Sequence, residues 1–400
     1  MRMRKKILLN GPVLSRSGYG EQARFALRSL KAHEDRFEIF LNAIPWGGTC
    51  WVYDDNEERR WIDDLLKKTI SHVQNNGQYD MSLQVTIPNE WQKLAPVNIG
   101  YTAGIETNIV APGWIEKANT MDKIIVVSNH AKAVYNATSY IDEQRKIEYK
   151  CNTPIDVVNY PVRNIGTAPV ELELDYDFNY LAVAQWSPRK NIGNTINWFM
   201  EEFRNEKVGL VLKINTVNNS ILDKVRSSHA ILSVVAAHPE SVCKVYLLHG
   251  TMTDEEMGGL YEHEKIKCMV NLAHGEGFGL PMFEAAAKGL PVICTDWSGQ
   301  TDFLYAPKKN KKTGKTKIKP YFYRVDYDLK QIQPEAVWEG VIEAQSQWAF
   351  AKEGSYRKQL RNVYSDTSRA VSQAKNLQKH LLESFTEEAK YKEFADAVFR

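Results

Sequence analysis

Short apolar runs alternate with longer amphipathic stretches along most of the chain. In the first part, apolar runs near residues 6, 38, 83, 98 and 124 are short enough to be buried strands. Between them, apolar residues recur at helical spacing over Glu21–Lys31, Glu57–Ser71, Pro112–Asn119 and His130–Thr138. Strands that alternate with helices predict a parallel sheet with helical crossovers.

The same alternation restarts after an irregular segment. Residues 161–177 carry prolines and an acidic cluster and lose the periodic pattern, and the rhythm of strands and helices returns from Tyr180 to Asp296. We therefore predict an α/β protein with one Rossmann-like domain over residues 1–165, a linker over 166–177 and a second Rossmann-like domain over 178–380. Helical spacing from Pro334 onward predicts C-terminal bracing helices, with a last helix over 381–400 that packs back on the first domain.

Composition is that of a soluble globular protein. The chain has 400 residues, of which 43% are hydrophobic and 25% charged, enough for two cores of ordinary size. No apolar run approaches the roughly 20 residues that span a bilayer, and the first apolar stretch is short for a signal peptide. We expect a cytoplasmic protein without integral membrane association, and the formal net charge of +2 does not indicate a general polyanion binder.

The segment from Gly275 to Leu304 carries the clearest chemistry. A strand ends in a glycine-rich turn, where Gly277 and Gly279 let backbone amides approach a ligand at the start of a helix, a natural seat for a diphosphate. Glu276 lies in the turn and Glu284 inside the helix. Because a carboxylate can accept two hydroxyls, the two glutamates suit a hexose and a ribose diol.

The stretch EGFGLPMFEAAAKGLPV resembles the signature of glycosyltransferase family 4 and its relatives, in which two glutamates are separated by seven residues. This resemblance implies a GT-B fold, with two Rossmann-like domains facing each other across a cleft. It also implies retaining transfer from a UDP- or GDP-sugar to a hydroxyl acceptor, with no cofactor and no divalent metal. Glu276 would contact the transferred sugar and Glu284 the ribose, while Phe278, Gly279 and Leu280 would offer backbone amides to sugar and phosphate.

A second motif, AQWSPRKNI, follows the first strand of the second domain. Arg189 and Lys190 lie at the start of a predicted helix, where they can neutralise a leaving diphosphate, and the family resemblance continues here. Gln185 replaces an arginine that many relatives carry, and we expect Lys213 to take its place. The alternative is that these cations are solvated surface charges.

Two further loops are assigned to the donor by resemblance. The turn Gly18-Tyr19-Gly20 precedes the first helix and would face the donor phosphates, although an ordinary turn is an equally good interpretation. The backbone near Gly250, Thr251 and Met252 would meet the nucleotide base.

Acceptor residues are less well indicated. Thr102, Glu106 and Thr107 follow a strand at the sheet edge where parallel sheets place ligands, and Ser128 ends the next strand. Glu106 suits an acceptor-side or catalytic role, or a cap or turn. Trp46 and Trp51 could stack on a sugar or belong to the core.

A lysine run leaves the acceptor class open. Lys308, Lys309, Lys311 and Lys312 begin a basic stretch that is either a solvated insertion or a contact for a nucleic-acid backbone. Besides a saccharide or small-molecule acceptor, the sequence therefore permits a transferase that acts on hydroxymethylated bases of duplex DNA, as some phage enzymes with this fold do. It also permits a catalytically silent sugar-nucleotide or nucleic-acid-binding module, or a sugar-nucleotide epimerase. The histidines are scattered and no DxD-type pair occurs where the donor phosphates are expected, so the sequence indicates no metal site.

Overall fold

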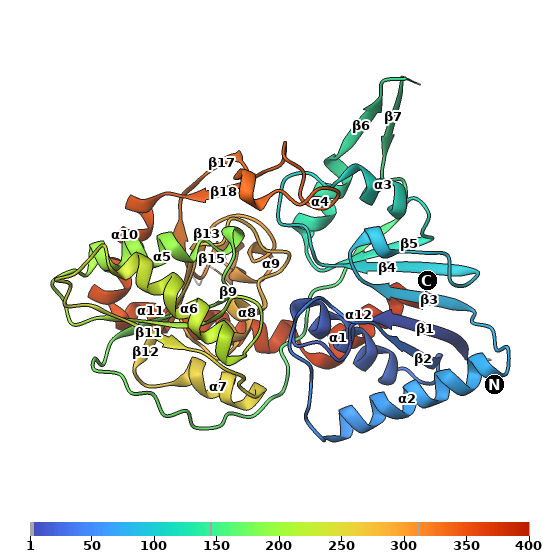
Figure 1. Ribbon diagram of the computed structural model, residues 1–400, viewed down its shortest axis with the longest axis horizontal. Coiled ribbons are helices and arrows are strands. Elements are labelled where there is room, and N and C mark those ends of the chain that lie inside the picture. Colours follow the sequence, from blue (N-terminus) through green and yellow to red (C-terminus); the bar gives the residue numbers. More distant parts are fainter. Residues whose placement is uncertain (1–3, 145, 310–312, 400) are drawn as a thin grey trace. The chain divides into compact units, whose positions relative to one another are not determined.

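The computed structural model describes residues 4–144, 146–309 and 313–399. The chain forms two compact units (Figure 1). Unit 1 holds the residues up to Pro161, Val337–Ser346 and the segment from Glu387 onward, and unit 2 holds Val162–Ala336 and Gln347–Thr386. Residues 166–177, which the sequence suggests as a linker, are thus counted with unit 2.

Unit 1 is built on a parallel sheet of six strands in the order β2-β1-β3-β4-β5-β8. The strands are β1 (Lys5–Gly11), β2 (Phe37–Ala43), β3 (Met81–Val85), β4 (Val97–Thr102), β5 (Lys123–Val126) and β8 (Ile155–Val157). The connecting helices are α1 (Gly18–Lys31), α2 (Glu57–Gln74), α3 (Pro112–Ala118) and α4 (Asn129–Ala137), with a 3-10 turn η1 (Pro88–Glu90) and a hairpin of β6 (Ser139–Asp142) and β7 (Ile147–Lys150). Central strands such as β1 are buried on both faces, which explains their continuous apolar runs.

Unit 2 repeats this architecture with the strand order β11-β10-β9-β12-β13-β16, again parallel throughout. Its strands are β9 (Asn179–Gln185), β10 (Gly209–Asn215), β11 (Lys244–Leu248), β12 (Ile266–Asn271), β13 (Val292–Thr295) and β16 (Tyr323–Val325). Its helices are α5 (Ile192–Glu202), α6 (Ile221–Val235), α7 (Asp254–Glu262), α8 (Leu280–Ala287), α9 (Thr301–Leu304), α10 (Glu353–Ser365) and α11 (Thr367–Ser384), with a 3-10 turn η2 (Pro188–Lys190). The two parallel sheets predicted from the alternation are confirmed.

Helical structure does not begin at Pro334 as the sequence predicts. After the short 3-10 turn η3 (Pro334–Ala336) the chain forms turns through Gly340, whose φ of 76° breaks a helix. This segment lies between the two strands of an antiparallel pair, β17 (Tyr327–Gln331) before it and β18 (Gln347–Ala351) after it, and the helices start only at Glu353. The basic stretch lies on a second antiparallel pair, in which β14 (Tyr305–Lys309) is paired with β15 (Thr316–Pro320).

Two late segments of the chain belong to unit 1. Asn89 Nδ2 donates to the carbonyl of Gly340 at 3.0 Å, and the last helix, α12 (Glu387–Phe399), lies beside α1 in Figure 1. Phe394 of α12 is fully buried and packs edge-on against Phe25 of α1, with ring centroids 5.2 Å apart. The C-terminal helix therefore completes the core of unit 1.

We predict that Phe394→Ala lowers the free energy of unfolding of unit 1 by about 3 kcal/mol, because the truncation leaves a cavity against Phe25 and Tyr101. Denaturant unfolding measures the change. The matched control is Lys392→Ala on the same helix, whose exposed ammonium pairs only with Asp396 in the contacts described, so we expect a loss of at most about 0.5 kcal/mol. Equal losses in the two variants would mean that α12 adds nothing to this core.

Candidate functional site

The glycine-rich turn after β12 is held by close backbone packing rather than left as an open loop. Residues 271–279 are all buried. Gly279 is the N-cap of α8 with φ 96°, a conformation that favours glycine. A Cβ on Gly299 would lie 2.0 Å from the carbonyl oxygen of Gly277, and the Gly299 amide donates to the Glu276 carbonyl at 2.9 Å. Glycines at both places therefore fix the path of the backbone around Glu276.

Glu276 is the centre of a buried ionic cluster. Its residue is 6% exposed, and its carboxylate accepts from Lys190 Nζ at 2.5 Å and from Arg189 Nη1 at 3.2 Å. Asn271 Nδ2 approaches the same carboxylate at 3.4 Å, and the Glu276 amide donates to Ser298 Oγ at 2.9 Å. Sequence reasoning missed Asn271 and Ser298, although Asn271 ends a strand that leads directly into the motif.

Charge pairing decides the protonation state of Glu276. Burial alone raises the pKa of this carboxyl, but the nearby Lys190 and Arg189 cations outweigh burial and bring the pKa down to about 2. At neutral pH the side chain is a carboxylate with two cationic partners, able to accept hydroxyl hydrogens.

Glu284 occupies a different environment eight residues later. It is exposed on α8 and accepts from the hydroxyl of Tyr261 at 3.1 Å. Tyr261 lies on α7 and is buried, so burial first and the neighbouring carboxylate second raise its pKa well above the ordinary value. Because Tyr261 and Glu284 are far apart in the sequence, no local pattern predicts that they are hydrogen-bonded.

Arg189 and Lys190 belong to the 3-10 turn η2 and not, as predicted, to the start of the helix. Asn191, with φ 53°, separates η2 from α5 and turns the chain. The turn directs both cations at the Glu276 loop, and Arg189 Nη1 also donates to the Gly275 carbonyl at 2.7 Å. The interpretation as free surface charges is wrong for both residues.

Phe278 and Leu280, which follow Glu276 in the glycine-rich motif, are part of the packing and helical structure of unit 2. Phe278 is buried and packs against Phe283 and Phe303, with centroids 5.1 and 5.0 Å away. Leu280 begins α8. For Phe278 the ring therefore belongs to the core, and its proposed contribution to a ligand stays with its backbone amide.

Lys213 lies at the end of β10 and donates from Nζ to the Gly250 carbonyl. Gly250 follows β11 with φ 122°, and Thr251 Oγ1 accepts from Asn219 Nδ2 at 3.2 Å. Met252 follows in the same loop, just before α7. The structure thus brings Lys213 to the loop that the resemblance assigns to the base.

Unit 1 has its own group of polar and aromatic side chains at the carboxyl ends of β1 and β4. The hydroxyls of Tyr19 and Thr102 lie 2.7 Å apart, and the Gly104 amide donates to the Tyr19 oxygen at 3.2 Å. The Trp46 ring lies against Tyr19 with a centroid distance of 4.5 Å. Burial raises the pKa of the Tyr19 phenol, which stays protonated. Tyr19 is therefore a fixed hydroxyl backed by an aromatic face.

The other predicted residues of unit 1 take varied positions. A Cβ on Gly20 would lie 1.9 Å from the Ser15 carbonyl, so the first helix needs glycine there, whereas Gly18 has open space. Glu106 is half-buried, near enough to Tyr19 to raise its pKa. Three residues have structural or surface placements: Thr107 donates to the Ile109 carbonyl, Ser128 caps α4 through the Ala131 amide, and Trp51 is 45% exposed.

The basic stretch falls on the hairpin of β14 and β15. Lys308 and Lys309 are exposed on β14, and Lys317 and Lys319 are exposed on β15. Lys311 and Lys312 lie outside the described residues. The lysines that are described therefore share one exposed two-stranded ribbon.

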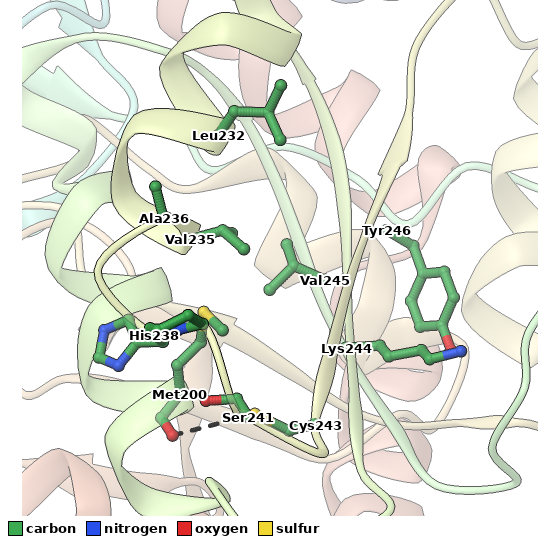
Figure 2. A pocket seen from close by; sticks show the side chains of 11 residues that line it. Met200, Leu232, Val235, Ala236, His238, Ser241, Cys243, Lys244, Val245 and Tyr246 are labelled. Atoms are coloured by element: carbon green, nitrogen blue, oxygen red, sulfur yellow. Dashed lines mark hydrogen bonds between the residues drawn. The ribbon is translucent and has the colours of Figure 1, made fainter.

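A pocket of about 500 Å³ also opens in unit 2. Figure 2 shows its lining, with Leu232 and Val235 of α6 opposite Val245 and Tyr246 of β11. Lys244, where β11 begins, also lines it, so the pocket lies toward the amino end of that strand. None of the predicted site residues lines it, and parallel sheets place ligands at the other end.

The described residues contain neither a candidate metal site nor a helix that could cross a membrane. Within the three described ranges, no three His, Cys, Asp or Glu side chains are grouped to hold a metal ion. In the same ranges, every helix is too short or too polar to cross a membrane.

Comparison with known proteins supports the resemblance read from the motifs. Residues 255–394, which include Glu276 and Glu284, match the family described as "Family 4 Glycosyltransferase in conflict systems". The serotype-specific mannosyltransferase WbdA of Escherichia coli is 31% identical over 121 residues, which are 30% of this chain and 13% of WbdA. The match thus spans only about an eighth of the length of that curated relative. The family match over residues 255–394 confirms the predicted resemblance to family 4 glycosyltransferases.

Solved structures identify the fold. The sucrose-phosphate synthase of Thermosynechococcus elongatus superimposes with a TM-score of 0.62 at 12% identity, covering 99% of this chain and 98% of that one. HepE of Anabaena, solved in complex with UDP, gives a TM-score of 0.58 at 13% identity, covering 98% and 99%. With the two parallel sheets, these similarities confirm the GT-B fold.

The Glu276 cluster predicts a pH-dependent contribution to stability. A glutamate in the unfolded chain has a pKa of about 4.3, whereas the folded pKa of Glu276 is about 2. The ion pairs therefore stabilise the fold fully above about pH 5, and this stabilisation is lost as the pH falls toward 2. We expect the stability difference between wild type and Glu276→Gln, measured by urea unfolding, to shrink over that interval. Glu264→Gln, at an exposed carboxylate of the same unit, is the control. A difference that stays constant from pH 7 to pH 3 would contradict the pairing.

Proposed function

We propose that this protein is a retaining glycosyltransferase that moves a sugar from a UDP- or GDP-sugar to a hydroxyl of a saccharide or other small molecule. The observation that carries the proposal is the buried Glu276 carboxylate, held ionised by Lys190 and Arg189 in a turn fixed by glycines. The match of residues 255–394 to a family 4 glycosyltransferase family supports it.

In this proposal the carboxylate and the two cations of the cluster have separate tasks. The Glu276 carboxylate accepts hydroxyl hydrogens of the transferred sugar, while Lys190 and Arg189 hold the donor diphosphate. As the bond between the anomeric carbon and the phosphate oxygen breaks, these cations neutralise the charge that develops on the leaving nucleoside diphosphate, a task that a divalent metal performs elsewhere. The acceptor oxygen bonds to the anomeric carbon on the same face, and its proton passes to the departing phosphate oxygen.

The remaining donor contacts are proposed from position. Glu284, exposed on α8, accepts the ribose hydroxyls, with Tyr261 orienting its carboxylate. The amides of Phe278, Gly279 and Leu280 face the sugar and phosphate, and Gly18, Tyr19 and Gly20 belong to the donor loop of unit 1. Gly250, Thr251 and Met252 meet the base; the likeness of the fold to HepE, solved with UDP, supports a uridine nucleotide as one candidate.

For the acceptor we propose Trp46 and Thr102 of unit 1, which the ring and the hydroxyl of Tyr19 hold in place. Trp46 offers an aromatic face and Thr102 a hydroxyl, which together suit a neutral sugar ring. Glu106 is the nearest candidate for a carboxylate that orients an acceptor hydroxyl. The exposed Trp51, Thr107 in the loop after β4 and Ser128 at the start of α4 complete the proposed acceptor side.

Glu276→Ala should lower kcat for nucleotide release by about 10²-fold or more while the protein still folds, because the variant loses hydroxyl contacts that matter in the transition state. The assay offers a panel of UDP- and GDP-sugars with and without an oligosaccharide, and circular dichroism reports folding. Glu264→Ala is the matched control, since this exposed carboxylate lies in the same unit away from the motif. Activity of Glu276→Ala within a few-fold of wild type would refute the site assignment.

A second candidate is a transferase that acts on hydroxymethylated bases of duplex DNA, and the exposed lysines of the β14–β15 hairpin are what favour it. The logarithm of the binding constant for duplex DNA decreases linearly with the logarithm of the salt concentration. If these lysines contact phosphates, that decrease becomes less steep by about 0.9 for each contact removed. Lys308→Gln with Lys309→Gln tests this, and Lys375→Gln with Lys379→Gln on α11 is the control. DNA binding that is weak, independent of salt and equal in both double variants would exclude this candidate.

A further inference from the structure

A buried acid and a buried histidine meet behind the loop proposed for the base. Asp223, in the first turn of α6, is 2% exposed, and the side chain of His249, which follows β11, is 3% exposed. His249 Nε2 lies 3.0 Å from Asp223 Oδ2, so the ring donates from Nε2 to the carboxylate. Neither side chain is among the predicted site residues, although His249 directly precedes Gly250 in the loop assigned to the base.

Asp223 also holds the turn that follows β10. Its carboxylate accepts from the Thr216 amide at 3.0 Å, from the Val217 amide at 2.8 Å and from the Thr216 hydroxyl. Burial raises the pKa of Asp223, but the bonds from His249 and Thr216 outweigh it and bring the pKa to about 2. The group is therefore an ionised acceptor with a full set of donors.

Two other contacts join the same pair of turns. Asn219 Nδ2 donates to Thr251 Oγ1 at 3.2 Å, and Lys213 Nζ donates to the Gly250 carbonyl. Because β10 and β11 are paired neighbours, both turns leave the sheet at the same edge. Gly250, with φ 122°, then bends the backbone into a conformation that side chains rarely permit.

We infer that Asp223 and His249 are positioning residues that fix the backbone of residues 250–252 for the nucleoside part of the donor. The inference rests on the proposed function, since it needs a nucleotide at this loop. The two side chains are buried and do not contact the ligand. They act by holding the turn after β11 against the turn after β10, so that its amides and carbonyls are oriented before the base arrives.

The experiment compares His249→Leu, His249→Gln and wild type in nucleotide release, and in direct calorimetric binding of UDP and GDP. His249→Leu removes the donor to Asp223, and we expect the donor KM and the nucleotide Kd to rise about tenfold while kcat stays within about twofold. His249→Gln restores an N–H near the position of Nε2, and we expect it to recover affinity to within about threefold of wild type.

Tyr180→Phe is the matched control, because it removes another buried hydrogen bond of unit 2, from the Tyr180 hydroxyl to the Leu360 carbonyl at 2.7 Å. We expect it to leave the donor KM unchanged. An active wild type whose KM is no more altered by His249→Leu than by Tyr180→Phe would overturn the positioning role alone. A wild type that neither binds UDP or GDP nor releases nucleotide would overturn the proposed function and this inference with it. If His249→Leu does not fold, His249→Gln and Asp223→Asn carry the comparison.

Discussion

The Glu276 carboxylate is buried, and its two cations, Lys190 and Arg189, are the main groups that stabilise its charge there. An unpaired buried carboxylate would be protonated or would destabilise the fold by several kcal/mol. Lys190 comes from the turn after β9, Glu276 from the turn after β12, and the Ser298 hydroxyl that receives the Glu276 amide from the turn after β13. Since β9, β12 and β13 are neighbours in the sheet, the ion pairs join the carboxyl ends of β9 and β12, and the hydrogen bond to Ser298 adds the end of β13.

The pairing of Glu276 with its two cations also determines which chemical groups a ligand must carry to bind there. Lys190 and Arg189 already neutralise Glu276, so a diphosphate that approaches them competes with the carboxylate. In exchange, the carboxylate needs new donors, and sugar hydroxyls are the groups that can supply them. A phosphate alone would draw the cations away and leave the Glu276 carboxylate without donors. A sugar alone would leave both cations paired with Glu276. The cluster therefore suits a ligand that carries both groups together.

The sequence was sufficient where a feature is local. Apolar runs predicted the buried strands, and the glutamate pair with its glycines carried the resemblance to family 4 glycosyltransferases, which in turn implied the GT-B fold. It was insufficient where distant residues meet. Nothing near Glu284 points to Tyr261 on another helix, and nothing near Pro334 indicates that the following residues return to Asn89. The helix expected there fails because helical spacing of apolar residues is also compatible with turns when a glycine interrupts it.

The polar groups of the two units differ in charge. The group in unit 2 is ionic, with a carboxylate between two cations, and suits the phosphates of a nucleotide sugar. The group in unit 1 is built from a protonated phenol, a hydroxyl and an indole face, with the Glu106 carboxylate close enough to raise the pKa of the phenol. A neutral aromatic and hydroxyl surface gives little attraction to a phosphate backbone and good contact with a sugar ring. This contrast is why a saccharide is the better acceptor to propose, while the exposed lysines of the β14–β15 hairpin favour DNA.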